Sequence, residues 1–115
     1  MKKNVLLVED DDCLRSSLRL ILENSDHVVE GAPDGKVALR ILQQKKFDAI
    51  ILDDNLPFIQ GTELLGLIRI NNPEVKIIIM SGLFNAEGIK KIREQGADVI
   101  IEKPFEFKTL LDHLQ

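Results

Sequence analysis

Five polar side chains that could do chemistry together each lie at or just after the end of a short apolar run. They are Glu9, Asp10, Asp53, Ser81 and Lys103. Three carboxylates brought close together repel one another, and a cation between them would relieve that repulsion. Such oxygen ligands suit Mg²⁺, which takes one or two carboxylates directly and keeps water or phosphate oxygens at its other positions. Because no His or Cys ends these runs, zinc is not indicated.

A carboxylate beside Mg²⁺, a hydroxyl and a lysine can accept a phosphoryl group. We assign the nucleophile to Asp53, because it follows the central apolar run, residues 49–52, and would be held at the end of a buried strand. Ser81 could donate a hydrogen bond to one phosphoryl oxygen. Lys103 could pair with another oxygen, and with Asp53 before the reaction. The neighbouring Asp54 is expected to be solvated.

The elements that must position these residues are short strands alternating with helices. The predicted strands are residues 5–8, 27–30, 49–52, 75–80 and 99–101, and a helical pattern follows each of them. Alternation of this kind predicts an α/β fold with a five-stranded parallel sheet and helices on both faces. We expect the doubly wound, flavodoxin-like order 2-1-3-4-5, whose ligand lies where strands 1 and 3 meet. Those two strands are the ones that end in acids.

Other residues are expected to have structural roles. His27 and His113 are predicted to lie on the surface, whereas Phe105 and Phe107 are predicted to lie in the core. Asp11 or Asp12 could cap the first helix. The helix expected from about residue 85 to residue 95 contains a glycine and few apolar anchors, so we expect it to be the least stable helix.

The composition narrows the class of protein. The chain has 115 residues, a net charge of −4 and neither Tyr nor Trp, so a nucleic-acid-binding surface is not indicated. No apolar run approaches the roughly 20 residues of a membrane span. The first predicted strand starts too early to leave room for a signal peptide, and the single cysteine, Cys13, fits a reducing compartment. We therefore expect a cytoplasmic protein.

The motifs together resemble a known family. LLVEDD, IILDDNLP with Gly61 four residues further on, IIIMSG, GAD and EKPF occur in this order. This pattern resembles the receiver domain of two-component response regulators, which has the flavodoxin-like fold. The resemblance covers essentially the whole chain, so we expect residues 1–115 to form one receiver (response regulatory) domain.

The resemblance implies a role for each site residue. Carried over by position, Asp53 is the phosphoacceptor, Glu9 and Asp10 are the acidic pair, and Ser81 is the switch hydroxyl. The Mg²⁺ ligands would be Asp10, Asp53 and the main-chain carbonyl of Asn55, next to Glu9. Lys103 would be the lysine of the site, followed by a cis peptide bond to Pro104.

The resemblance also implies partners. A sensor histidine kinase or a phosphotransfer protein would donate the phosphoryl group, and a downstream effector or an attached output domain would respond. The domain would catalyse its own phosphorylation and slow dephosphorylation without being a turnover enzyme. A phosphorylation-dependent homodimer would fit the family, whereas direct binding to nucleic acid or membrane is not expected.

One position departs from the family. Ile100, three residues before the lysine, stands where an aromatic switch residue is usual. This leaves open an alternative, a receiver-like interaction module that acts without phosphorylation. A phosphohydrolase of the dehalogenase type is less well supported, because Asn55 replaces the second Asp of its Asp-x-Asp motif. A flavin-binding protein is disfavoured by the four acids at residues 9–12, which would repel a phosphate.

Overall fold

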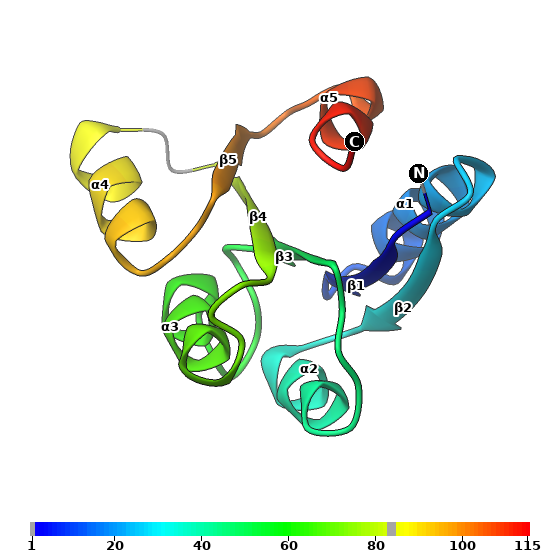
Figure 1. Cartoon of the computed structure of the whole chain (residues 1–115). Coiled ribbons are helices and arrows are strands. Elements are labelled where there is room, and N and C mark those ends of the chain that lie inside the picture. The colour runs from blue at the N-terminus through cyan, green and yellow to red at the C-terminus, as the bar shows by residue number, and fades with distance from the viewer. Residues whose placement is uncertain (1, 83–84) are drawn as a thin grey trace.

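Five strands and five helices alternate along the chain in the computed structural model, which describes residues 2–82 and 85–115 (Figure 1). The strands are β1 (Asn4–Val8), β2 (Val28–Ala32), β3 (Ala49–Asp53), β4 (Lys76–Ser81) and β5 (Val99–Glu102). The helices are α1 (Asp12–Asn24), α2 (Gly35–Leu42), α3 (Gly61–Asn71), α4 (Ala86–Glu94) and α5 (Phe107–Asp112). The predicted alternation is confirmed, although β2 lies slightly later in the chain than residues 27–30.

The strands form one sheet in the order β2-β1-β3-β4-β5, and all of its neighbouring pairs are parallel. The predicted fold class and strand order are therefore confirmed. The register aligns Val8 with Leu52 and Asp53 with Met80. Because parallel strands end at the same edge of a sheet, this register brings the polar residues after β1, β3, β4 and β5 to one edge.

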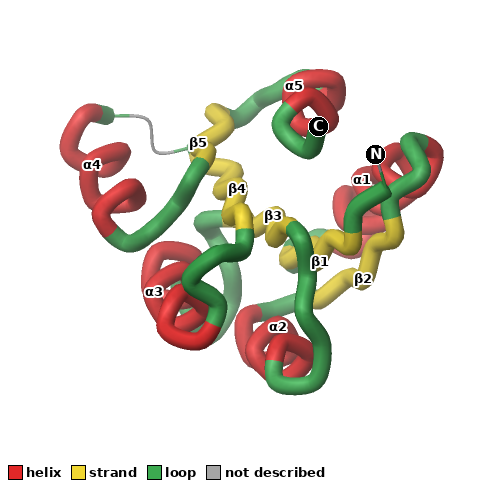
Figure 2. Tube along the Cα trace, in the orientation of Figure 1, coloured by secondary structure: helices red, strands yellow, loops and turns green. Residues whose placement is uncertain are grey.

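Helices cover both faces of the sheet. Helices α1 and α5 lie on one face, and α2, α3 and α4 lie on the other (Figures 1 and 2). Successive strand residues alternate between the two cores, because strand side chains point to opposite faces. Leu6 packs with the α2–α3–α4 core and Leu7 packs with the α1–α5 core, and both are fully buried. This double burial explains the continuous apolar runs of β1, β3 and β4, whereas the edge strand β2 is partly exposed and contains Glu30.

Side-chain caps start three of the helices. Asp11 accepts hydrogen bonds from the N–H groups of Cys13 and Leu14 and so caps α1. Asp34 and Asn85 cap α2 and α4 in the same way. Each cap satisfies N–H groups that the first helical turn leaves unpaired. The first helix therefore begins directly after the acids that end β1, which helps to place them.

Two predictions about buried residues were wrong. His27 is only 7% exposed, and its Nδ1 atom accepts a hydrogen bond of 3.2 Å from the N–H of Lys3. Burial lowers the pKa of His27, which favours the neutral ring that this acceptor role requires. Phe107, the first residue of α5, is 41% exposed, whereas Phe105 packs partly against the α1–α5 core. In the part of the chain that the structure describes, no helix is long and apolar enough to cross a membrane.

Candidate functional site

Five of the six predicted site residues lie at or next to strand ends around one edge of the sheet. Glu9 and Asp10 directly follow β1, Asp53 ends β3, Ser81 ends β4, and Lys103 directly follows β5. The N–H of Lys103 donates a hydrogen bond of 2.8 Å to the carbonyl oxygen of Ser81, which ties the ends of β4 and β5 together. The convergence predicted from the order of the strands is therefore present in the structure.

The carboxylates form a compact acidic group. Oxygen atoms of Glu9, Asp10 and Asp53 all lie within 4.8 Å of one another. Glu9 and Asp53 are only 2% and 3% exposed, whereas Asp10 is exposed to solvent. The Oε2 atom of Glu9 is buried and has no hydrogen-bond partner among the described residues. A buried oxygen without a partner, next to two other carboxylates, fits the oxygen-only ligand set that Mg²⁺ prefers.

Burial and proximity shift the pKa values of this group. Burial, together with a hydrogen bond to Asp53, raises the pKa of Glu9 to about 8. Burial also acts to raise the pKa of Asp53, but hydrogen bonds from Glu9, Lys103 and the N–H of Asn55 outweigh it and lower that pKa. Without a metal ion, Asp53 is therefore ionised at neutral pH while Glu9 keeps its proton.

Lys103 is paired with the predicted nucleophile. Its Nζ atom lies 2.5 Å from Oδ1 of Asp53 and 3.8 Å from Oδ1 of Asp54. Burial alone would lower the pKa of Lys103, but the hydrogen bond and charge of Asp53, helped by Asp54, raise it. The lysine therefore stays charged beside Asp53. The peptide bond between Lys103 and Pro104 is cis, as the resemblance implied.

Asn55 lies beside Asp53 in the loop after β3. Its N–H donates a hydrogen bond of 3.2 Å to Oδ1 of Asp53, and its side chain is exposed. This bond helps to hold the Asp53 carboxylate in place. The role predicted for its main-chain carbonyl, as a metal ligand, stays a prediction.

The prediction that Asp54 is solvated was wrong. Its side chain is only 10% exposed, and its Oδ2 atom accepts a hydrogen bond of 2.7 Å from the hydroxyl of the fully buried Ser81. The N–H of Asp54 donates to the carbonyl of Met80, so the pairing of β3 with β4 continues through this residue. The signal that could have identified Asp54 as a site residue is its position directly after Asp53, at the edge of the sheet where Ser81 and Lys103 also lie.

Gly61 shapes the loop that carries Asp53 and Asp54. Its N–H donates a hydrogen bond of 3.1 Å to the carbonyl of Asp54. A Cβ atom on Gly61 would lie 2.5 Å from the Cα atom of Asp54 and 2.6 Å from the carbonyl oxygen of Asp53. Only a glycine allows the start of α3 to approach the end of β3 this closely.

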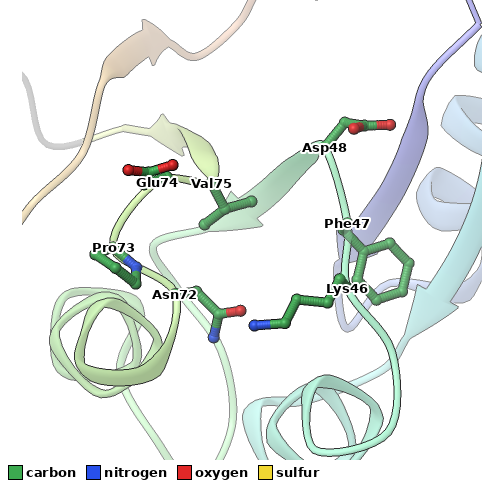
Figure 3. Close-up of a pocket in the computed structure, with 7 residues that line it drawn as sticks. All are labelled: Lys46, Phe47, Asp48, Asn72, Pro73, Glu74 and Val75. Carbon is green, nitrogen blue, oxygen red and sulfur yellow. The ribbon is translucent and has the colours of Figure 1, made fainter.

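Two open cavities of about 430 Å³ lie at opposite edges of the sheet. The first is next to the acidic group and is lined by Asp54, Asn55, Gln60, Gly82 and Lys103. The second lies where β3 and β4 begin, between the segments 46–48 and 72–75 (Figure 3). It contains none of the predicted site residues. The first cavity therefore opens the site to molecules in solution.

Comparisons with known proteins agree with this geometry. A family model described as the response regulator receiver domain matches residues 5–115. The chain is 36% identical over 112 residues to the response regulator protein FleR of Pseudomonas aeruginosa, covering 97% of this chain and 24% of FleR. It is 31% identical over 112 residues to the chemotaxis protein CheY of Halobacterium salinarum, covering 97% of this chain and 93% of CheY.

Solved structures show the same fold. The chemotaxis response regulator CheY4 of Vibrio cholerae superposes with a TM-score of 0.93 at 31% identity, covering 100% of this chain and 98% of CheY4. The BeF3-activated DrrB receiver domain superposes with a TM-score of 0.89 at 27% identity, covering 99% of this chain and 95% of DrrB. The chain belongs to the response regulator receiver domain family.

Proposed function

We propose that this domain accepts a phosphoryl group on Asp53 from the phosphohistidine of a histidine kinase or a phosphotransfer protein. A carboxylate oxygen of Asp53 attacks phosphorus, the P–N bond of the donor breaks, and the histidine nitrogen keeps the bonding electrons. The product is an acyl phosphate on Asp53. The observation that carries this proposal is the buried Asp53, which is paired with Lys103 beside an acidic group and an open cavity.

The acidic group fits Mg²⁺ by its ligand chemistry and by the unpartnered Oε2 atom of Glu9. We propose that Asp10, Asp53 and the main-chain carbonyl of Asn55 hold the ion, with Glu9 beside them. When bound, Mg²⁺ would supply charge neutralisation for the phosphoryl oxygens.

Lys103 and Ser81 would stabilise the phosphorylated state. Lys103 already contacts Asp53 and can pair with a phosphoryl oxygen once that group is in place. Ser81 can donate its hydroxyl proton to another phosphoryl oxygen if the side chain leaves its present partner, Asp54. Phosphorylation would then shift the population between two arrangements of the β4–α4–β5 face, which a partner reads.

We propose that the readout is an altered interaction with a downstream effector or a covalently attached output domain. The chain spans 24% of FleR and 50% of QseB of Haemophilus influenzae, which is named a transcriptional regulatory protein. The domain itself would not bind nucleic acid, would act in the cytoplasm, and would form a homodimer only when phosphorylated. Its chemistry would be limited to accepting and slowly losing the phosphoryl group, without turnover of a substrate.

A second candidate is an interaction module that works without phosphorylation. Ile100 favours it, because this half-buried residue packs in the α2–α3–α4 core where the family usually has a switch aromatic. Under this alternative, partner binding would be unchanged by Asp53→Asn.

Intact mass after incubation with acetyl phosphate, with and without Mg²⁺, would distinguish these functions. We expect a labile, Mg²⁺-dependent gain of one phosphoryl group in the wild type and in Asp54→Asn, but not in Asp53→Asn. Asp54→Asn is the matched control, because it changes the adjacent carboxylate in the same way. If folded wild-type protein gains no mass, the phosphoacceptor function is wrong and the interaction module takes its place.

A further inference from the structure

The carboxylate of Asp54 lies next to the Ser81 hydroxyl and the Lys103 ammonium group, the two groups that we propose bind the phosphoryl oxygens. Its Oδ2 atom accepts a hydrogen bond of 2.7 Å from the hydroxyl of Ser81. Its Oδ1 atom lies 3.8 Å from Nζ of Lys103. Since the side chain is only 10% exposed, solvent screens these interactions weakly. In the unphosphorylated domain the carboxyl group of Asp54 therefore engages both Ser81 and Lys103.

Asp54 and a phosphoryl group on Asp53 would compete for Ser81. A serine hydroxyl has a single proton to donate. While that proton is donated to Asp54, it cannot be donated to a phosphoryl oxygen. The backbone of Asp54 is held on both sides, by its N–H bond to Met80 and by the N–H of Gly61 on its carbonyl. The competition must therefore be resolved by rotation of side chains and not by movement of the loop.

We propose that Asp54 is a positioning residue that holds Ser81 in the resting state and must release it when Asp53 is phosphorylated. This inference rests on the proposed phosphoacceptor function. It assigns a role to the residue after the acceptor: the Asp54–Ser81 hydrogen bond sets how readily the domain switches. Removing the carboxylate makes the phosphorylated arrangement easier to reach.

A cavity next to Asp54 could hold its carboxylate after the hydrogen bond to Ser81 is broken. A cavity of about 200 Å³ lies between α3 and α4, and Asp54 lines it together with Thr62, Lys91 and Ile92. The ammonium group of Lys91 and the hydroxyl of Thr62 can receive a carboxylate that has left Ser81. Lys91 and Ile92 belong to α4, so the release of Asp54 would alter contacts of that helix. This gives a route to the β4–α4–β5 face that does not need an aromatic residue at position 100.

A double-mutant cycle with Asp54→Ala, Ser81→Ala and the double variant tests the proposal. The probe is beryllofluoride with Mg²⁺, titrated into the whole domain and followed by NMR. We expect Asp54→Ala to raise the affinity for beryllofluoride about tenfold when Ser81 is present, since a hydrogen bond to a charged group no longer competes. In the Ser81→Ala background the gain should fall to about twofold or less, because the competing bond is already absent.

Asp54→Asn keeps the shape of the side chain and an acceptor oxygen for Ser81 but cannot carry a negative charge. The affinity of this variant for beryllofluoride should therefore lie between those of the wild type and Asp54→Ala. An equal gain in both Ser81 backgrounds would mean that Asp54 acts only through its charge, and the proposal would be overturned. No gain in Asp54→Ala would overturn it as well.

Urea unfolding of the same four proteins, without Mg²⁺ or beryllofluoride, tests the hydrogen bond independently of phosphorylation. We expect the two substitutions to be coupled by about tenfold in the unfolding equilibrium constant. Absence of coupling would overturn the role of Asp54 even if the wild type accepts a phosphoryl group. The four proteins could also show coupling while the wild type neither binds beryllofluoride nor gains mass. The contact between Asp54 and Ser81 would then exist, but the proposed function and the release of Ser81 that rests on it would be wrong.

Discussion

The Nζ atom of Lys103 lies 2.5 Å from Oδ1 of Asp53, although the two residues are fifty positions apart in the chain. The contact exists because the ends of β3 and β5 flank the end of β4 at one edge of the sheet. A buried carboxylate would normally resist ionisation, and this ammonium group offsets that cost. Together with hydrogen bonds from Glu9 and the N–H of Asn55, the pair therefore lowers the pKa of Asp53 and favours its ionised form.

Replacing Lys103 with Met should slow phosphorylation by acetyl phosphate about 100-fold, because a fixed positive charge beside the transferring group is lost. The rate of mass gain in the presence of Mg²⁺ measures this effect. Lys108→Met removes the same charge from an exposed position on α5 and should react like the wild type. Equal rates in the two variants would contradict a role for Lys103 in the reaction.

Replacing Glu9 with Gln should change how stability depends on pH. The pKa of Glu9 rises from its ordinary 4.5 to about 8 in the folded domain, so the folded state holds a proton that the unfolded state releases. This contribution to the free energy of unfolding is complete below pH 4.5 and declines as the pH rises to about 8. A glutamine side chain cannot ionise, so Glu9→Gln should lack that decline.

Urea unfolding between pH 4.5 and pH 9, without Mg²⁺, compares the two profiles. The difference between Glu9→Gln and the wild type should grow in favour of the variant toward pH 8. Parallel profiles would show that Glu9 does not hold its proton. In the wild type, Mg²⁺ affinity should increase over the same pH window, because ionisation of Glu9 adds a negative charge beside the ion.

Replacing Gly61 with Ala should destabilise the domain by about 1–3 kcal/mol and slow phosphorylation, because the added methyl group would meet the backbone of Asp53 and Asp54. Thermal or urea unfolding together with the acetyl phosphate assay measures both effects. Gly66→Ala, in the interior of the same helix, is the matched control. Its Cβ atom would lie 3.4 Å from Oε1 of Gln95, and we expect a gain of about 0.5–1 kcal/mol from helix propensity.

Arg69 is the side chain that holds the opposite end of the sheet together. Its guanidinium group donates hydrogen bonds to the carbonyls of Gly96 and Val75 and pairs with Asp98 at 2.8 Å. Asp98 in turn accepts a hydrogen bond from the N–H of Ile77 in β4. Arg69→Ala should lower the free energy of unfolding by about 1–3 kcal/mol, because the part-buried carbonyls of Gly96 and Val75 lose their donor, whereas the ion pair with the exposed Asp98 adds little.

Arg69→Lys should recover only part of this loss, because an ammonium group cannot reproduce the planar fork of donors. Arg93→Ala, on the exposed side of α4, is the control and should change stability by less than about 0.5 kcal/mol. Urea unfolding at one pH compares the three variants. A small effect of Arg69→Ala would mean that water satisfies these carbonyls as well as the guanidinium group does.

The sequence by itself determined the architecture and the edge where the site lies. Apolar runs such as residues 49–52, with helical patterns between them, specify a doubly covered parallel sheet, and Asp53 comes directly after such a run. Residues that end parallel strands must meet at one edge. The positions of Glu9 and Lys103 relative to Asp53 therefore followed from order along the chain, without knowledge of any side-chain contact.

Only the tertiary structure decided what the side chains touch. Asp54 and His27 look like surface residues in their local sequence, yet one accepts a hydrogen bond from Ser81 and the other from the N–H of Lys3. Phe107 looks like a core residue and is exposed. Local patterns report propensity and periodicity, whereas these outcomes depend on the direction of a side chain and on neighbours 24 to 27 positions away. Those neighbours are set by the packing of the whole domain.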